Sequence, residues 1–158
     1  MVATVALRCM KMEQQQATNY FITLCGISGS GKSTLSKELA KTYDAKLYSY
    51  DDIMSSFQKK PIEVRTWILE SIKNDLQSGF NVVLDDLNIL EKSRREILEA
   101  IQECNSQKIL AHMNTPLDMC LLRNSKRKKR LPDWIIKHMH RKYQSPTLDE
   151  GWDEIRYY

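Results

Sequence analysis

The sequence is poor in several features that define other classes of protein. Only 5 Gly and 4 Pro occur among 158 residues, which excludes a collagen-like or low-complexity chain. No apolar run approaches the roughly 18–20 residues that a membrane span needs. The apolar stretch 1–7 is short and follows no basic region, so it does not read as a secretory signal.

Cysteines are few and lack a motif spacing. The four of them match neither a zinc site nor a redox pair, and they stand at Cys9, Cys25, Cys104 and Cys120. We interpret them as reduced thiols and therefore expect a cytoplasmic protein.

Charge is distributed unevenly along the chain. The formal net charge is +4, yet the segment 123–142 contains nine Lys or Arg and one acid, Asp133. A concentrated basic segment on an otherwise mildly acidic chain suggests an anionic partner such as nucleotide phosphate or nucleic acid, although a solvated charged face is an equal alternative.

From residue 20 onward, short apolar runs alternate with helical patterns, whereas residues 1–19 form an N-terminal extension that need not be ordered. Strand patterns cover 20–25, 46–50, 80–84, 108–112 and 155–157; helical patterns cover 32–43, 51–57, 61–78, 91–104, 117–125 and 132–143. This alternation predicts βαβ units. We expect residues 20–158 to form one three-layer α/β/α domain with a mainly parallel sheet.

A glycine-rich motif joins the first strand to the first helix. It reads Gly26-Ile27-Ser28-Gly29-Ser30-Gly31-Lys32-Ser33, which satisfies G-x-x-x-x-G-K-[ST] in full. Its glycines let successive backbone N–H groups point inward, and the helix N-terminus adds a positive dipole end. We expect this phosphate-binding loop, with Thr34 after it, to bind ATP. Lys32 would reach the β- and γ-phosphates, and the Ser33 hydroxyl would ligate Mg²⁺.

Paired carboxylates follow two of the predicted strands. Asp51-Asp52 comes after the second strand, where a carboxylate can accept the proton of an attacking hydroxyl or cap a helix. Asp85-Asp86 ends the third strand, as a Walker-B-like carboxylate does, and either residue can bind Mg²⁺ or close a turn.

The basic run from Arg123 to Arg130 precedes Pro132. Arginines on a mobile segment can close over a transferring phosphoryl group, which predicts a helical lid. A nucleic-acid patch, a nuclear localisation signal and a solvated helix end are the alternatives.

Taken together, these residues resemble the kinase domain of polynucleotide 5′-hydroxyl kinases of the phage and animal end-repair types, over about residues 20–157. The stretches that carry the resemblance are Gly26–Ser33, Asp51-Asp52, Asp86-Leu87-Asn88 with Arg94-Arg95, Arg123–Arg127 with Pro132, and Tyr143–Trp152. The resemblance implies that Lys32 and Ser33 hold ATP and Mg²⁺, that Asp51 is the general base, and that Arg127, with Arg123 as second candidate, contacts phosphates from the lid.

The departures from that family lie on the acceptor side. Phage-type enzymes have an arginine three residues after the base and a threonine between the strand-end Asp and Asn; here these positions are Met54 and Leu87. The residue before the base, often Arg in that family, is Tyr50. The expected reaction is transfer of the ATP γ-phosphate to a polynucleotide 5′-hydroxyl. A small-molecule or tRNA-linked hydroxyl, and an ATPase or switch without an acceptor, are the alternatives.

Two smaller expectations concern surface and packing. Trp67 and Trp134 are expected to be packing residues on amphipathic helices, and Trp152 to anchor the C-terminal segment. The acidic residues from Asp149 to Glu154 are expected to neutralise the basic segment.

Overall fold

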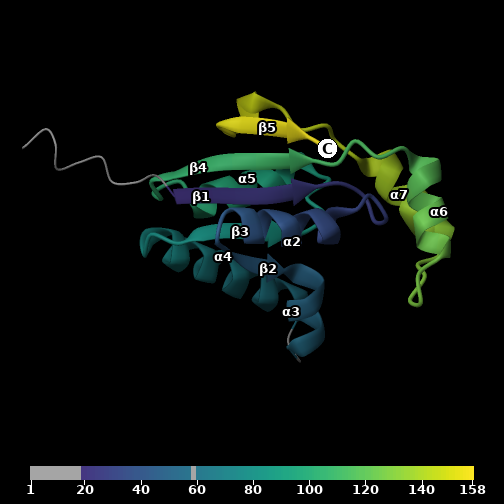
Figure 1. The fold of residues 1–158 in the computed structure, drawn as a ribbon, viewed down its shortest axis with the longest axis horizontal. Helices are drawn as coiled ribbons and strands as arrows, with labels where there is room; N and C mark the ends of the chain where they lie inside the picture. Colours follow the sequence, from purple (N-terminus) through teal and green to yellow (C-terminus); the bar gives the residue numbers. More distant parts are fainter. Residues whose placement is uncertain (1–18, 58–59) are drawn as a thin grey trace, which may run out of the picture.

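The computed structural model describes residues 19–57 and 60–158, so residues 1–18 of the N-terminal extension lie outside it. Five strands form one sheet, and the helices lie on its two faces and at its carboxyl end (Figure 1). The strands are β1 (Asn19–Cys25), β2 (Ala45–Ser49), β3 (Asn81–Asp85), β4 (Ser106–His112) and β5 (Glu154–Tyr157). The helices are α2 (Lys32–Thr42), α3 (Tyr50–Ser56), α4 (Pro61–Gln77), α5 (Glu91–Ala100), α6 (Leu117–Ser125) and α7 (Asp133–Lys142), with a 3₁₀ turn, η1 (Leu148–Glu150).

The strand order is β2-β3-β1-β4-β5, and every neighbouring pair is parallel. Each parallel connection requires a crossover, and a helix supplies it after most of the strands. The predicted parallel sheet and three-layer α/β/α fold are therefore confirmed, and even the short strand expected near the C-terminus joins the sheet edge beside β4.

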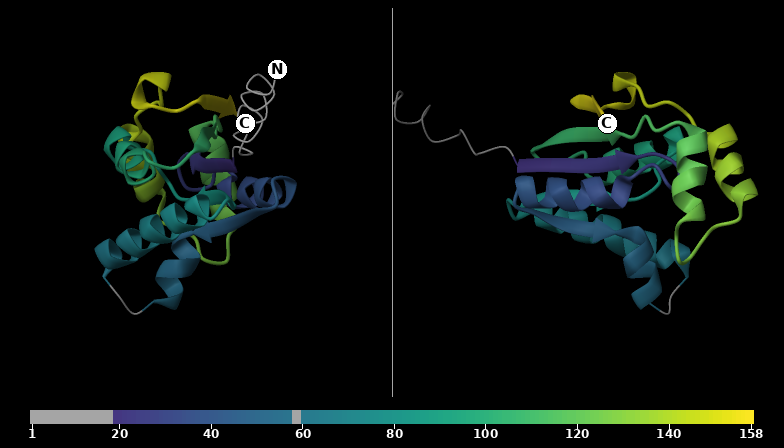
Figure 2. Two further views of the ribbon diagram at one scale, coloured as in Figure 1. Left: turned by 90° about the vertical axis from the view of Figure 1, so that its left-hand side faces the viewer. Right: turned by 45° about the vertical axis from the view of Figure 1, so that its right-hand side comes forward.

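Alternate residues of the central strands pack on opposite faces of the sheet. In β1, Phe21 joins the cluster under α4 and α5, whereas Ile22 joins the cluster under α2. Figure 2 shows α2 on one side of the sheet and α4 and α5 on the other. Both faces are buried because strands in a βαβ sheet are covered twice, so these strands read as continuous apolar runs.

Local sequence signals set most of the helix boundaries. In α4, Pro61 occupies the first turn and the Glu63 carboxylate accepts a hydrogen bond from the Lys60 backbone N–H (3.2 Å). Gly79 follows the helix with φ +86°, a conformation that only glycine adopts without strain. The expected helix 61–78 is thus confirmed within one residue.

None of the helices in the described part of the chain is long and apolar enough to cross a lipid bilayer.

The differences between expected and observed helices are small. The helix expected over 91–104 ends as an α-helix at Ala100, and turns follow it to Cys104.

Candidate active site

The phosphate-binding loop connects β1 to α2, as its motif predicts. Two of its glycines have positive φ, +87° at Gly29 and +103° at Gly31. A Cβ atom on Gly29 would lie 2.5 Å from the Cys120 carbonyl oxygen of α6, which is a severe clash. Gly29 is therefore required twice, for its backbone conformation and for the close approach of α6.

The interior of this loop is built to attract an anion. The Lys32 side chain is buried, and its Nζ donates a hydrogen bond to the Ile27 carbonyl oxygen (2.9 Å), which holds the ammonium over the loop. Burial lowers the pKa of Lys32, and the nearby carboxylates of Asp85 and Asp86 act in the opposite direction.

Unpartnered donors surround that ammonium. In the described residues, the backbone N–H groups of Gly29, Gly31, Lys32 and Ser33 donate no hydrogen bond, and the buried Ser30 hydroxyl has no partner. Backbone donors at a helix N-terminus next to a cation fit a bound phosphate group.

The two strand-end carboxylates have different surroundings. Asp85 is buried and accepts a hydrogen bond from the Ser36 hydroxyl (3.2 Å). Burial raises the pKa of Asp85, while the Ser33 hydroxyl and the Lys32 ammonium oppose that rise. Asp85 therefore lies on the same side as the loop serine, where a divalent cation bound to a phosphate would need an oxygen ligand.

The Asp86 carboxylate is fixed by one hydrogen bond from α4 and one from the backbone of the next residue. Its Oδ2 accepts a hydrogen bond from Arg65 Nη1 (3.1 Å), and its Oδ1 accepts one from the Leu87 backbone N–H (2.7 Å). Arg65 also donates to the Ser93 carbonyl oxygen (3.1 Å), so α4 and α5 share this contact. The sequence could not separate the two aspartates, because only packing shows which neighbours each one meets.

A cleft of about 170 Å³ brings the predicted catalytic groups together. Asp51 and Arg127 both line this cleft, and the remaining lining includes Gly29, Lys32, Ser33, Asp85 and Asp86. Asp51 belongs to the first turn of α3, whose N-cap is Ser49, so neither Asp51 nor Asp52 caps this helix. Asp52 is exposed and does not line the cleft.

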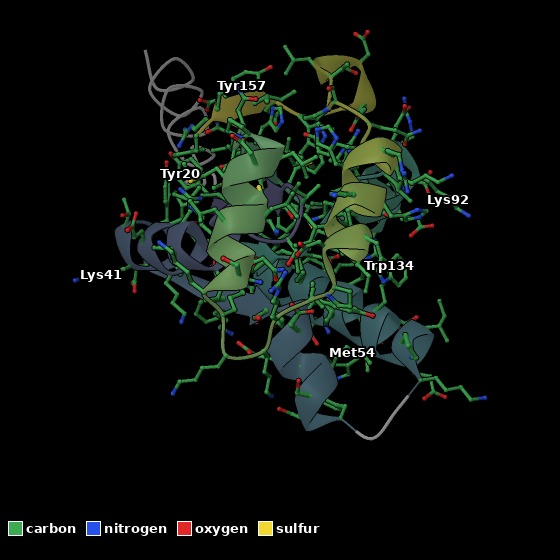
Figure 3. The ribbon with its side chains drawn as sticks, turned by 90° about the vertical axis from the view of Figure 1, so that its right-hand side faces the viewer. Tyr20, Lys41, Met54, Lys92, Trp134 and Tyr157 are labelled. Carbon is green, nitrogen blue, oxygen red and sulfur yellow. The ribbon has the colours of Figure 1, made fainter. Side chains whose placement is uncertain are left out.

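The lid consists of α6, α7 and the loop 126–132 between them (Figure 3). Arg123 Nη1 donates to the Ser30 carbonyl oxygen (3.1 Å), and Arg127 Nη1 donates to the Ser28 hydroxyl (3.2 Å). Asn124 is buried and exchanges two hydrogen bonds with the Leu131 backbone (2.8 and 3.1 Å), which closes the base of the loop. Both candidate lid arginines therefore contact the phosphate-binding loop.

A second hollow, of about 470 Å³, lies on the other side of the loop. Thr34, Thr115, Arg123 and Tyr158 are among its lining residues, and Arg127 borders both this hollow and the cleft. The Thr115 hydroxyl donates to the Ser30 carbonyl oxygen (2.9 Å) and fixes the loop against the segment after β4.

The acceptor side is less polar than the resemblance alone would predict. Tyr50 and Leu87 line the cleft, whereas Met54 packs against the apolar cluster between the sheet and α4. Figure 3 labels Met54 on α3, below the lid. No cation is therefore present at that position to bind an acceptor phosphate.

One structural element near the site escaped sequence reasoning. Arg94 and Glu150 form a buried two-point ion pair (2.6 and 2.7 Å), and Arg94 also donates to the Asn88 carbonyl oxygen (2.9 Å). Asn88 has φ +46° and lies in the loop after β3. The sequence did contain a signal that Arg94 is buried. Arg94 stands three, four and seven residues before Ile97, Leu98 and Ile101, so it lies on the same apolar face of the helix.

The acidic C-terminal residues do not neutralise the lid, and that expectation is wrong. Glu150 forms an ion pair with Arg94, and Glu154 forms one with Arg156. The Asp153 carboxylate accepts a hydrogen bond from the Lys108 backbone N–H. Trp152 is buried and donates from Nε1 to Glu150 (3.1 Å), which confirms it as an anchor of the C-terminal segment.

The chain is similar to proteins that are named as kinases. It is 30% identical over 141 residues to the L-seryl-tRNA(Sec) kinase of Methanococcus maripaludis, covering 84% of this chain and 55% of that protein. The chain thus spans about half the length of this curated relative.

Solved structures share the fold at lower identity. A putative kinase from Chloroflexus aurantiacus superposes with a TM-score of 0.73 at 18% identity, covering 90% of this chain and 86% of the other. The Pnkp1/Rnl/Hen1 RNA repair complex gives 0.71 at 20% identity, with 83% and 46% covered. Kti12 of Chaetomium thermophilum in complex with ADP-AlF3 gives 0.67 at 13% identity, with 87% and 88% covered.

The family model described as "Chromatin associated protein KTI12" matches residues 20–154, which is nearly all of the described domain. With the P-loop kinase fold and this match together, the chain belongs to the KTI12 family.

Proposed function

We propose that this protein is an ATP-dependent kinase that transfers the γ-phosphate to a hydroxyl group carried by RNA. The observation that carries the proposal is the cleft in which Asp51 lines the same cavity as Lys32, Ser33 and Arg127. A carboxylate that shares a cleft with a phosphate-binding loop is positioned to receive the proton of an acceptor hydroxyl.

On the donor side, the loop Gly26–Ser33 with Thr34 would bind the phosphates of ATP. The hollow between Arg123 and Tyr158 would take the nucleoside, since it adjoins the outer side of the loop. In the described residues no three His, Cys, Asp or Glu side chains converge on one point. Mg²⁺ fits this site nonetheless, because it commonly takes few protein oxygens beside phosphates and water.

Ser33 and Asp85 would be the principal protein ligands of Mg²⁺, with Asp86 nearby. The ion would offset negative charge on the β- and γ-phosphates. Lys32 and Arg127 would stabilise the charge that spreads over the transferring phosphoryl group. Asp51 would accept the hydroxyl proton while the acceptor oxygen bonds to the γ-phosphorus and the bond to the β-phosphate oxygen breaks, leaving ADP.

Two kinds of RNA-borne hydroxyl are compatible with the proposal. The resemblance to polynucleotide kinases favours a 5′-hydroxyl. The two departures on the acceptor side favour a tRNA-linked hydroxyl, because Met54 packs against the apolar cluster and Leu87 lines the cleft where an arginine and a threonine would serve a nucleotide end. The seryl-tRNA kinase relative agrees with the second form, which we regard as the better supported.

The test measures transfer of labelled γ-phosphate from ATP with Mg²⁺. The acceptors are serine-charged tRNA, uncharged tRNA, 5′-hydroxyl RNA and DNA oligonucleotides, and free L-serine. Labelling of charged tRNA alone supports the tRNA-linked hydroxyl, and labelling of uncharged oligonucleotides supports the 5′-hydroxyl. ATP hydrolysis that no acceptor stimulates would support an ATPase or switch instead.

Asp51→Asn tests the base, and Asp52→Asn is its matched control. Loss of a general base typically costs about 10²–10⁴-fold in rate, so Asp51→Asn is expected to lose transfer while it retains ATP affinity. Asp52 is exposed outside the cleft, so Asp52→Asn is expected to transfer at the wild-type rate. Equal rates for wild type and Asp51→Asn would show that Asp51 is not the base.

A further inference from the structure

Helix α7 presents a tryptophan to solvent, contrary to the expectation that Trp134 is a packing residue. Ile136 is buried and Met139 packs beside it, so these residues define the inward face of the helix. The outward face consists of Trp134, Lys137, His138 and Arg141, at helical spacings of three, four and seven. The Trp134 side chain is 68% exposed.

Figure 3 labels Trp134 beside the start of α7. By contrast, Trp67 on α4 is 41% exposed, and its ring packs against those of Phe57 and Tyr48. An aromatic ring that is 68% exposed offers a face on which an external planar group can stack.

The charge around this ring is positive and largely unpaired. Asp133 is the acid of the segment 123–142, and it already pairs with Arg130 (3.0 Å). In the part of the chain that the structure describes, Lys137 and Arg141 form no ion pair, and neither do Lys126, Lys128 and Lys129 of the lid loop. The positive charge is therefore available to an anionic ligand.

We propose that the outward face of α7 is a docking surface for single-stranded RNA. Trp134 would stack on a base, and Lys137 and Arg141 would contact the adjacent backbone phosphates. A single ring among cations suits a nucleic acid, whose every base has a stacking face. A protein groove or a membrane would instead require several apolar residues on the same face.

The position of α7 connects this surface to the cleft. The lid loop, α7 and α3 all lie at the carboxyl end of the parallel sheet (Figure 1), and the lid loop carries Arg127 into the cleft. RNA bound along α7 would thus lie on the lid itself, on the helix that follows the loop carrying Arg127. The inference rests on the proposed RNA-borne acceptor, and it adds where that RNA is held.

The first experiment measures binding of a fluorescent uridine 12-mer RNA to the protein over a range of salt concentrations. Trp134→Ala is expected to weaken binding roughly 5- to 150-fold, which corresponds to the loss of one stacked base. Trp134→Phe keeps an aromatic ring and should retain most of the affinity. Lys137→Ala/Arg141→Ala is expected to lower the slope of log K against log salt by about 1.4, because two phosphate contacts are lost.

Lys37→Ala/Lys41→Ala on α2 is the matched control. It removes the same charge from exposed positions of another helix, and Figure 3 shows Lys41 at the left edge of the molecule and Trp134 on the other side of α7. Its salt slope should equal that of the wild type. The inference is overturned if Trp134→Ala binds RNA as tightly as wild type, if the two double variants reduce the slope equally, or if anionic lipid vesicles bind in place of RNA.

Parallel transfer assays separate this inference from the proposed function. RNA binding that depends on Trp134, without phosphorylation of any RNA acceptor, would refute the function and leave the docking surface standing. Phosphorylation of an RNA acceptor with an unchanged KM in Trp134→Ala would refute the docking surface alone.

Discussion

The buried ion pair between Arg94 and Glu150 leads to a large and specific stability prediction. Both side chains are almost completely inaccessible, at 0% and 1% exposure, and two hydrogen bonds of 2.6 and 2.7 Å join them. Glu150→Ala would leave the Arg94 guanidinium buried without its counter-charge. Breaking such a pair costs about 3–5 kcal/mol, a large fraction of the roughly 5–15 kcal/mol that stabilises a typical domain.

Urea denaturation followed by circular dichroism measures this effect. At this chain length the expected loss corresponds to a melting temperature lower by roughly 6–20 °C. Glu103→Ala is the control, because its ion pair with Lys73 is exposed (38% and 70%) and should be worth less than about 1 kcal/mol.

Replacing both partners tests the physical reason. Arg94→Met/Glu150→Met removes the charges together, so it should be less destabilising than Glu150→Ala. A loss below about 1 kcal/mol for Glu150→Ala, or a double variant no better than the single one, would refute the claim that an uncompensated buried charge is the cause.

Three further predictions follow from the loop, the acceptor side and the same ion pair. Gly29→Ala should abolish ATP binding in isothermal calorimetry, because its Cβ would meet the Cys120 carbonyl oxygen at 2.5 Å; wild-type affinity would contradict this. Arg65→Met should lower the transfer rate more than the affinity for ATP, because Asp86 loses its partner on α4; unchanged steady-state kinetics would argue against it. Burial raises the pKa of Glu150, but the hydrogen bonds from Arg94 and Trp152 lower that pKa by more than burial raises it. The pKa of Glu150 in the folded state is therefore below the unfolded value. Its stabilisation is therefore complete above about pH 4.5 and is lost as the pH falls through the folded-state pKa, and wild type should lose more stability than Glu150→Gln between pH 7 and pH 3 in urea titrations.

Much of the fold and of the donor site followed from local sequence. The loop motif sets its own conformation, because its glycines permit positive φ and the helix that follows supplies the dipole. The apolar runs of β1 and β3 predicted a sheet covered on both faces, and Pro61 and Gly79 marked the ends of α4. These features depend on residues close together in the chain, so their spacing is sufficient.

The tertiary structure decided how residues distant in sequence meet. Adjacent aspartates such as Asp85 and Asp86 read alike in a sequence, yet one meets Ser36 of α2 and the other Arg65 of α4. Likewise, packing buried Glu150 against Arg94 and left Trp134 in solvent, opposite to what charge and hydrophobicity predicted for each. Composition and periodicity indicate whether a side chain prefers water or the protein interior. Only the packed chain determines which partner lies within reach of that side chain. For a buried charge or an exposed ring, the partner decides the role.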